Sequence, residues 1–176
     1  MPLIDSSSTN TSPAPAVADD PSWRRWNLVG LTVLTTYSTA LGWQAQEVSY
    51  PLFRAVGAGD FAAYHQLYNE AIPLPVIVPG FLCFVAATAF PWSRPRAVPR
   101  PAAIAVGLVG LASLASTVLW AIPLHDRLDA EGLSAATIDG LLSANLVRTL
   151  ALTAGTVVLT WCTGRLLQRG GARGPL

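Results

Sequence analysis

The feature that most constrains this chain is an arginine, Arg148, inside an apolar run that extends from about Leu141 to Leu167. A run of this length is sufficient to cross a bilayer, for which about 20 residues are needed. A guanidinium at that depth costs roughly 2.5 kcal/mol or more, so it is expected to face a bundle interior and to have a partner there. We therefore expect other helices to enclose Arg148.

The composition is typical of one small membrane domain. The 176 residues are 52% hydrophobic and only 12% charged, whereas charged residues approach a quarter of a soluble domain. The net charge is +1, and no basic patch able to neutralise phosphates is present, so we expect no nucleic-acid partner. Cys83 and Cys162 form no C-x-x-C pair, which argues against disulfide-exchange chemistry.

Apolar segments predict an all-α fold, a four-transmembrane-helix bundle with a short amphipathic helix before helix 2. The short helix places an aromatic face and a histidine at i, i+3, i+4 and i+7, from Phe61 through Tyr64 and His65 to Tyr68. It is either a lid packed on the bundle or a source of ligand contacts. The expected spans are about 26–48, 72–92, 102–123 and the apolar part of a helix from Ser134 to Leu167.

Local signals set the expected helix ends. Tyr50-Pro51 should end the first helix, and Asp60 is a candidate N-cap for the short one. The third helix should end in the charged cluster 122–127, after which Gly132 and Ser134 indicate a turn and an N-cap. The glycines and small residues of the third helix should let neighbouring helices approach closely.

Arginine distribution predicts the topology. Residues 1–22 read as a disordered tail without a signal peptide, residues 23–168 as the membrane domain, and residues 169–176 as a short tail. We expect a multi-pass protein of the cell membrane with both tails cytoplasmic, because eight of the eleven arginines flank one side. These are Arg24, Arg25, Arg94, Arg96, Arg100, Arg165, Arg169 and Arg173.

With that topology, unusual polar residues from every helix fall in one layer near the outer interface. Arg148 should pair with Glu47 or, failing that, with Asp126. Two interpretations remain open: a polar plug that fixes helix register, or a pocket for a lipophilic ligand with an anionic or enolic group. Glu47 has a further alternative, an interfacial carboxylate in water. The layer comprises Gln44, Glu47, His65, Glu70, Trp120, His125, Asp126, Asn145 and Arg148.

The motif content excludes several chemistries. No H-E-x-x-H, G-x-S-x-G, G-x-G-x-x-G or P-loop motif is present. Two histidines are too few for a multi-histidine di-iron site, although haem ligated by His65 and His125 stays open. We expect no metal and no other cofactor.

The stretches 120–128 and 145–149 resemble small four-helix bacterial membrane proteins of the anthrone oxygenase-like family. The matched positions are Trp120, His125, Asn145 and Arg148, and the resemblance spans roughly Leu28 to Leu167. It implies a four-helix bundle. For the fungal branch it implies cofactor-independent oxygenation of anthrones in polyketide pathways.

Two functions compete. In the first, a membrane enzyme acts on a lipophilic, polyketide-type substrate, with Arg148 stabilising an enolate or phenolate and His125 or His65 as base. In the second, the protein is a non-catalytic accessory subunit or half of a small dimeric transporter, so a homodimer is a candidate state. The expected partners are the lipid bilayer and a lipophilic small molecule. The candidate substrate-binding residues are Gln44, Glu47, Tyr68, Trp120 and Asn145.

Overall fold

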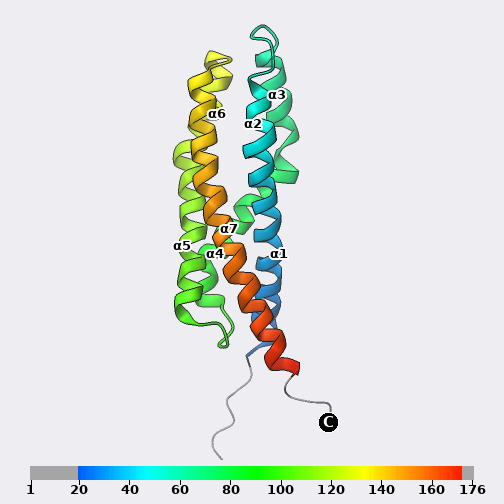
Figure 1. Cartoon of the computed structure of the whole chain (residues 1–176), viewed down its shortest axis with the longest axis vertical. Coiled ribbons are helices and arrows are strands. Elements are labelled where there is room, and N and C mark those ends of the chain that lie inside the picture. The colour runs from blue at the N-terminus through cyan, green and yellow to red at the C-terminus, as the bar shows by residue number, and fades with distance from the viewer. Residues whose placement is uncertain (1–19, 172–176) are drawn as a thin grey trace, which may run out of the picture.

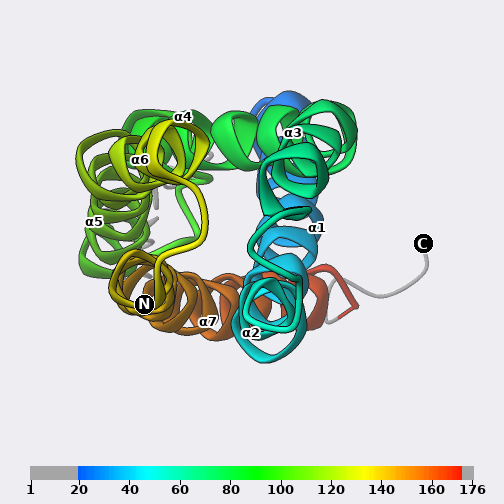
Figure 2. The same cartoon turned by 90° about the horizontal axis from the view of Figure 1, so that it is seen from above.

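The computed structural model describes residues 20–171, which fold into helices without a strand. Four long helices stand side by side, each packed against two neighbours in the order α1, α4, α5, α7 and back to α1 (Figures 1 and 2). The predicted tail at 1–22 lies outside the described residues except for its last three. The long helices are α1 (Ser22–Gln44), α4 (Val78–Ser93), α5 (Arg100–Ser116) and α7 (Ala135–Gly171).

Three of the four long helices adjoin a π-helical segment, and we call each continuous series of helical segments a column. In the α1 column it is η1 (Ala45–Ser49), which leads into α2 (Tyr50–Phe53). In the α4 column η2 (Pro73–Ile77) precedes α4. In the α5 column η3 (Thr117–Ala121) leads into α6 (Ile122–Glu131).

A proline is the second residue of the helix that follows each π-helical segment: Pro51, Pro79 and Pro123. Proline has no N–H to donate, and its ring clashes with the carbonyl four residues earlier in a regular α-helix. The i to i+5 turn of a π-helix is wider, and the column continues through each proline. The predicted helix ends at Tyr50-Pro51 and at residues 122–127 are therefore wrong.

The connection between α6 and α7 is short. α6 ends at Glu131 and is followed by Gly132, whose φ of 80° is in the left-handed region that glycine tolerates. The Ser134 hydroxyl then accepts the backbone N–H of Thr137 at 3.3 Å, which confirms the predicted turn and N-cap. Asp60 precedes α3 (Phe61–Ala71) but makes no capping hydrogen bond with its side chain. α3 packs against α6.

Among the described residues, three helical stretches are long and apolar enough to cross a membrane: Pro73–Ser93, Arg100–Glu131 and Ala135–Gln168. Large apolar side chains also point outward around the bundle, such as Leu74 and Leu119, which are 81% and 77% exposed. A helix that is apolar on its outer face as well as its inner face is typical of a lipid environment. These helices indicate a membrane protein.

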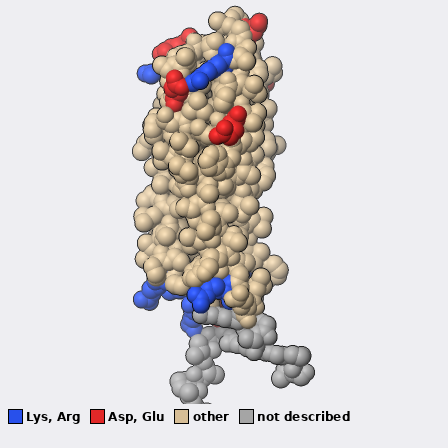
Figure 3. Space-filling view, viewed as in Figure 1, with Lys and Arg blue, Asp and Glu red and all other residues tan. Residues whose placement is uncertain are grey.

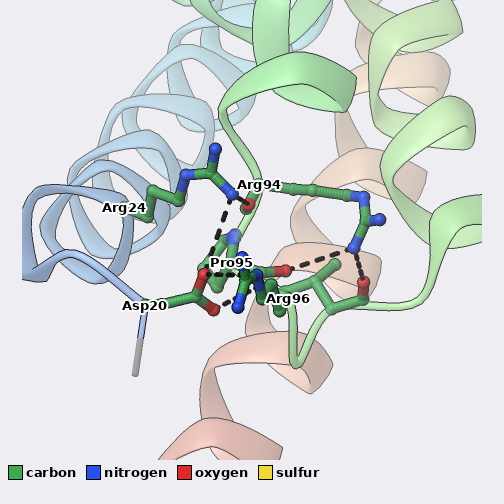
Figure 4. Close-up of polar contacts among 6 residues, drawn as sticks. Asp20, Arg24, Arg94, Pro95 and Arg96 are labelled. Carbon is green, nitrogen blue, oxygen red and sulfur yellow. Dashed lines mark hydrogen bonds and ion pairs between the residues drawn. The ribbon is translucent and has the colours of Figure 1, made fainter. Parts of the chain in front are cut away.

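On the face drawn in Figure 3, the visible charged side chains lie toward the two ends of the molecule. Both ends of the described chain lie at the lower end in Figure 1. There the Asp20 carboxylate accepts the backbone N–H of Arg96 and lies 3.7 Å from a guanidinium nitrogen of Arg24 (Figure 4). Arg94 donates to the carbonyl of Val98 at 2.6 Å. The Asp20–Arg96 hydrogen bond, together with one from Arg24 to the Arg94 carbonyl at 3.4 Å, joins the start of α1 to the loop between α4 and α5.

Glycines allow the closest helix contacts, as the sequence predicts. A Cβ at Gly110 of α5 would lie 2.5 Å from the backbone nitrogen of Thr88 and 2.6 Å from the carbonyl oxygen of Phe84 in α4. A Cβ at Gly42 of α1 would lie 2.5 Å from the Thr149 hydroxyl of α7. The α4–α5 contact involves main-chain atoms, which cannot move aside by changing a rotamer.

We expect Gly110→Ala to lower the free energy of unfolding by about 1–3 kcal/mol, because α4 and α5 must separate to admit the methyl group. Denaturant unfolding of the purified protein in detergent measures this. The matched control is Gly30→Ala in α1, where no atom lies within 4 Å of the added Cβ; helix propensity alone should leave that variant unchanged or slightly more stable. Equal losses in both variants would contradict the packing explanation.

Candidate functional site

The bundle encloses a partly open cavity of about 150 Å³ where the three π-helical segments meet. Each segment contributes to its wall: Ala45 from η1, Ile77 from η2 and Thr117 from η3. π-turns are frequent at functional sites, and broken helices are tolerated at membrane depth where they line a cavity. The polar residues of the wall are Ser38, Gln44, Tyr50, Tyr68, Thr117, His125 and Arg148, and the remaining lining is mainly aliphatic and phenylalanine side chains.

A proline leaves one carbonyl of η2 without its usual helical hydrogen bond, and a tyrosine of α1 binds that carbonyl. Because Pro79 has no N–H, the carbonyl of Pro75 lacks its usual helical donor. The Tyr37 hydroxyl of α1 donates to this carbonyl at 2.8 Å. The bond ties η2 to α1 beside the cavity.

Arg148 reaches the cavity wall from α7, and the side chains that hold it within the described part of the chain are neutral. Its guanidinium donates to the Thr117 hydroxyl of η3 at 2.9 Å and to the Asn145 side-chain oxygen at 2.7 Å. The Asn145 amide in turn donates to the Gly42 carbonyl and to the Gln46 side-chain oxygen, each at 2.9 Å. Within residues 20–171, no carboxylate lies at ion-pairing distance from Arg148.

The predicted pairing of Arg148 with Glu47 or Asp126 is therefore wrong. Glu47 lies in η1, where the wider turn changes the direction of the side chains relative to a regular α-helix, and it is exposed. Asp126 lies beyond Pro123 on α6 and is also exposed. The guanidinium thus keeps an uncompensated positive charge at the cavity.

Two histidines form the centre of a second polar group. His65 of α3 and His125 of α6 are 3.1 Å apart, from Nε2 of the first to Nδ1 of the second. The other nitrogen of His65 lies 2.6 Å from a carboxylate oxygen of Asp129, and Nε2 of His125 lies 3.3 Å from the Tyr50 hydroxyl. Asn69 donates to the same carboxylate at 3.0 Å. His125 and Tyr50 line the cavity, whereas His65 lies behind them.

This geometry argues against haem ligation by the histidine pair. The facing nitrogens of His65 and His125 hydrogen-bond to each other, so they do not flank a space for iron. The remaining nitrogens face Asp129 and Tyr50. Among the described residues, no group of three or more histidine, cysteine, aspartate or glutamate side chains has an arrangement that could hold a metal ion.

The structure places the predicted site residues in three groups. Gln44, Tyr68, His125 and Arg148 line the cavity. Asn145 and His65 are buried one layer behind, where they contact Arg148 and His125 respectively.

The third group lies outside the cavity wall, contrary to the predicted common layer. Glu47, Glu70 and Asp126 are exposed, and Trp120 is 42% exposed on the outer side of η3. Both Glu47 and Trp120, which were predicted to bind substrate, belong to π-helical segments. Their directions therefore do not follow from a 3.6-residue period.

Sequence reasoning missed Tyr50, Thr117 and Asp129. Asp129 had a usable signal, because it lies four residues after His125 on the same helix face. Tyr50 had none, since the adjacent proline indicated a helix end. Thr117 is one of the small residues of the third predicted helix, which indicate close helix packing and not a site.

Tyr68 supplies a neutral hydroxyl beside these groups. Burial raises the pKa of the Tyr68 phenol above its usual range, nearby Tyr50 raises it further, and Arg148 opposes the shift. The phenol therefore remains protonated at neutral pH and can donate a hydrogen bond to a ligand oxygen in the cavity.

Comparison with protein-family models, with curated proteins and with solved structures gives no match to this chain.

We expect Asn145→Leu to destabilise the protein by about 1–3 kcal/mol, because it removes the buried hydrogen bonds of the Asn145 side chain to the Arg148 guanidinium and to the Gly42 carbonyl. Glu47→Gln should have no measurable effect, since Glu47 is exposed. Thermal unfolding in detergent compares the two. A loss of stability in Glu47→Gln as large as that in Asn145→Leu would indicate that Glu47 does pair with Arg148, contrary to the structure.

Proposed function

We propose that the chain is a four-span membrane protein, with α1 as the fourth span and both described ends at the cytoplasmic face. α1 packs against α4 and α7 along the bundle, although it is not among the three most apolar stretches. Arginines gather at the end that contains both described ends of the chain (Figures 1 and 3). Arginine-rich flanks favour the cytoplasmic side.

We further propose that the cavity binds a lipophilic small molecule that carries an anionic or acidic oxygen. The observation that supports this most is Arg148, a cation at the wall of a mainly apolar cavity whose described partners are all neutral. A charge in a low-dielectric site attracts an opposite charge strongly. The apolar remainder of the wall suits a hydrophobic ring system.

The same wall holds a candidate base. The Nε2 atom of His125 is hydrogen-bonded to the Tyr50 hydroxyl, and both side chains line the cavity with Arg148 and Tyr68. Removal of a proton next to a ligand carbonyl would produce an enolate, which the guanidinium and the Tyr68 hydroxyl would stabilise. The proposed activity is thus proton abstraction from a lipophilic enolisable compound.

The resemblance to anthrone oxygenase-like proteins extends this proposal to oxygenation. The enolate of such a compound would react with dioxygen to give a hydroperoxide, and loss of water would leave a ketone. Here Arg148 and His125, two of the matched positions, lie at the wall. Asn145, a third, holds Arg148 in place.

For the topology, we expect single cysteines at Gly59→Cys and Glu131→Cys to react with an impermeant thiol reagent from outside intact cells. Both positions are exposed at the end opposite the arginine cluster. Glu131 is preferable to Gly132, whose positive φ would strain a cysteine. The control is Ala97→Cys, in the loop between α4 and α5, which should react only after permeabilisation. The reverse pattern would invert the orientation.

For the ligand, we expect hydroxylated anthrone-type compounds to raise the melting temperature of the protein in detergent and to be oxidised under air. Arg148→Gln should remove both effects, because it removes the cation at the cavity wall. The matched control is Arg127→Gln, an arginine that pairs with Glu131 on the surface of α6 and should retain both effects.

Failure of every compound to shift the melting temperature of the wild-type protein would reject the ligand proposal. The polar groups around Arg148 would then serve only to fix the register of α1, η3 and α7. Loss of the effect in both arginine variants would point to global destabilisation, which the unfolding curves without ligand reveal.

A further inference from the structure

We propose that Tyr50, His125, His65 and Asp129 form a proton relay between the cavity and the aqueous face at the end opposite the arginine cluster. The relay deepens the proposed function, on which it rests for the source of the proton. Its successive contacts measure 3.3 Å from Tyr50 to His125, 3.1 Å from His125 to His65 and 2.6 Å from His65 to Asp129. Every contact is within hydrogen-bonding distance.

The burial of these groups changes along the series as a relay requires. Tyr50 is buried, and both Tyr50 and His125 line the cavity. His65 has no exposed surface, so it cannot exchange a proton with water directly. The Asp129 side chain is 45% exposed and therefore reaches solvent. His65 is thus the buried link between a cavity group and a surface carboxylate.

The hydrogen bonds have a single consistent direction. An ionised Asp129 can only accept, and Asn69 also donates to its oxygens, at 3.2 and 3.0 Å. His65 must then carry its hydrogen on Nδ1 and accept from His125 through Nε2. His125 carries its own hydrogen on Nδ1 and accepts the Tyr50 O–H through Nε2. The Tyr50 O–H and the two Nδ1–H groups therefore each have one acceptor within the relay.

Each step of the transfer breaks one bond to hydrogen and forms another, and no group is oxidised or reduced. A proton from the ligand binds the Tyr50 oxygen while the Tyr50 O–H bond breaks and an N–H bond forms at Nε2 of His125. The Nδ1 proton of His125 passes to Nε2 of His65, and the Nδ1 proton of His65 passes to the Asp129 carboxylate. Asp129 finally releases one proton to water.

The relay has a consequence for the reaction class. After one passage both imidazoles carry their hydrogens on Nε2 instead of Nδ1. The His65 ring stacks on Phe61 at 5.6 Å and contacts the edge of Phe53 at 5.5 Å, which hinders the rotation that would restore it. A proton moving in the opposite direction restores both tautomers. The relay therefore suits a reaction in which the substrate first loses a proton and an intermediate or product then regains one.

The neighbouring ionisable groups are compatible with this direction. Tyr68 of α3 stacks near His125 at 6.2 Å, and Arg148 of α7 lines the same cavity. Asp129 is the anion at the far end.

The relay can be tested by nuclear magnetic resonance of the whole protein in lipid nanodiscs without any ligand. The chain has only two histidines, so ¹⁵N-histidine labelling with a histidine-free purification tag gives four side-chain nitrogen signals. We expect both hydrogens on Nδ1 and a coupling across the hydrogen bond between Nδ1 of His125 and Nε2 of His65. A hydrogen on Nε2 of either ring, or no such coupling, would overturn the proposed direction.

Deuterium exchange tests transport along the relay. We expect Asp129→Asn to lose the exchange of the His125 N–H with bulk D₂O that the wild-type protein shows, because the amide can accept a hydrogen bond but cannot carry the proton to water. Asp129→Glu should retain the exchange. The matched control Asp126→Asn, an exposed carboxylate on the same helix, should also retain it.

Unchanged exchange in Asp129→Asn would overturn the relay. If that variant does not fold, the tautomer measurement on the wild-type protein still decides. Because no ligand is used, failure of the ligand assay together with the expected tautomers and exchange would reject the proposed substrate class and leave the relay intact.

Discussion

The missing N–H of proline is the constraint on which this structure depends. Pro51, Pro79 and Pro123 each follow a π-helical segment, and each segment contributes to the wall of one cavity. In a regular α-helix these prolines would clash with the preceding turn, whereas a π-turn accommodates them and lets the column continue. The bundle thus has irregular backbone at the level where polar side chains converge.

Arg148, which lies in this layer, has neutral hydrogen-bond partners and not the carboxylate of a structural ion pair. Truncating one member of a buried ion pair leaves the other charge uncompensated, which makes such pairs costly to disturb. Here Asn145 and Thr117 satisfy the geometry of the guanidinium without neutralising its charge. In the proposed function this charge binds an acidic ligand, and His125 of the same wall, hydrogen-bonded to the buried His65, takes part in proton transfer.

The all-helical fold, the three most apolar spans and the position of the Ser134 cap could be predicted from hydropathy and local capping signals. The convergence of His125 and Arg148 on one cavity agrees with the predicted polar layer. The placement of Glu47 and Trp120 in that layer does not, because both belong to π-helical segments, in which side-chain directions do not follow a 3.6-residue period. Pro51 and Pro123 led to two predicted helix ends at positions where the helical structure continues.

The sequence by itself determined that the chain is helical and apolar enough for a membrane, since both properties follow from local composition and periodicity. It also determined that Arg148 needs enclosure, because a guanidinium at that depth is costly to leave in lipid. Only the tertiary structure decided that neutral groups hold this arginine and that Asp129 joins the two histidines. Those contacts join residues from different helices, and the π-turns that rotate the helix faces depend on packing between columns that no local pattern contains.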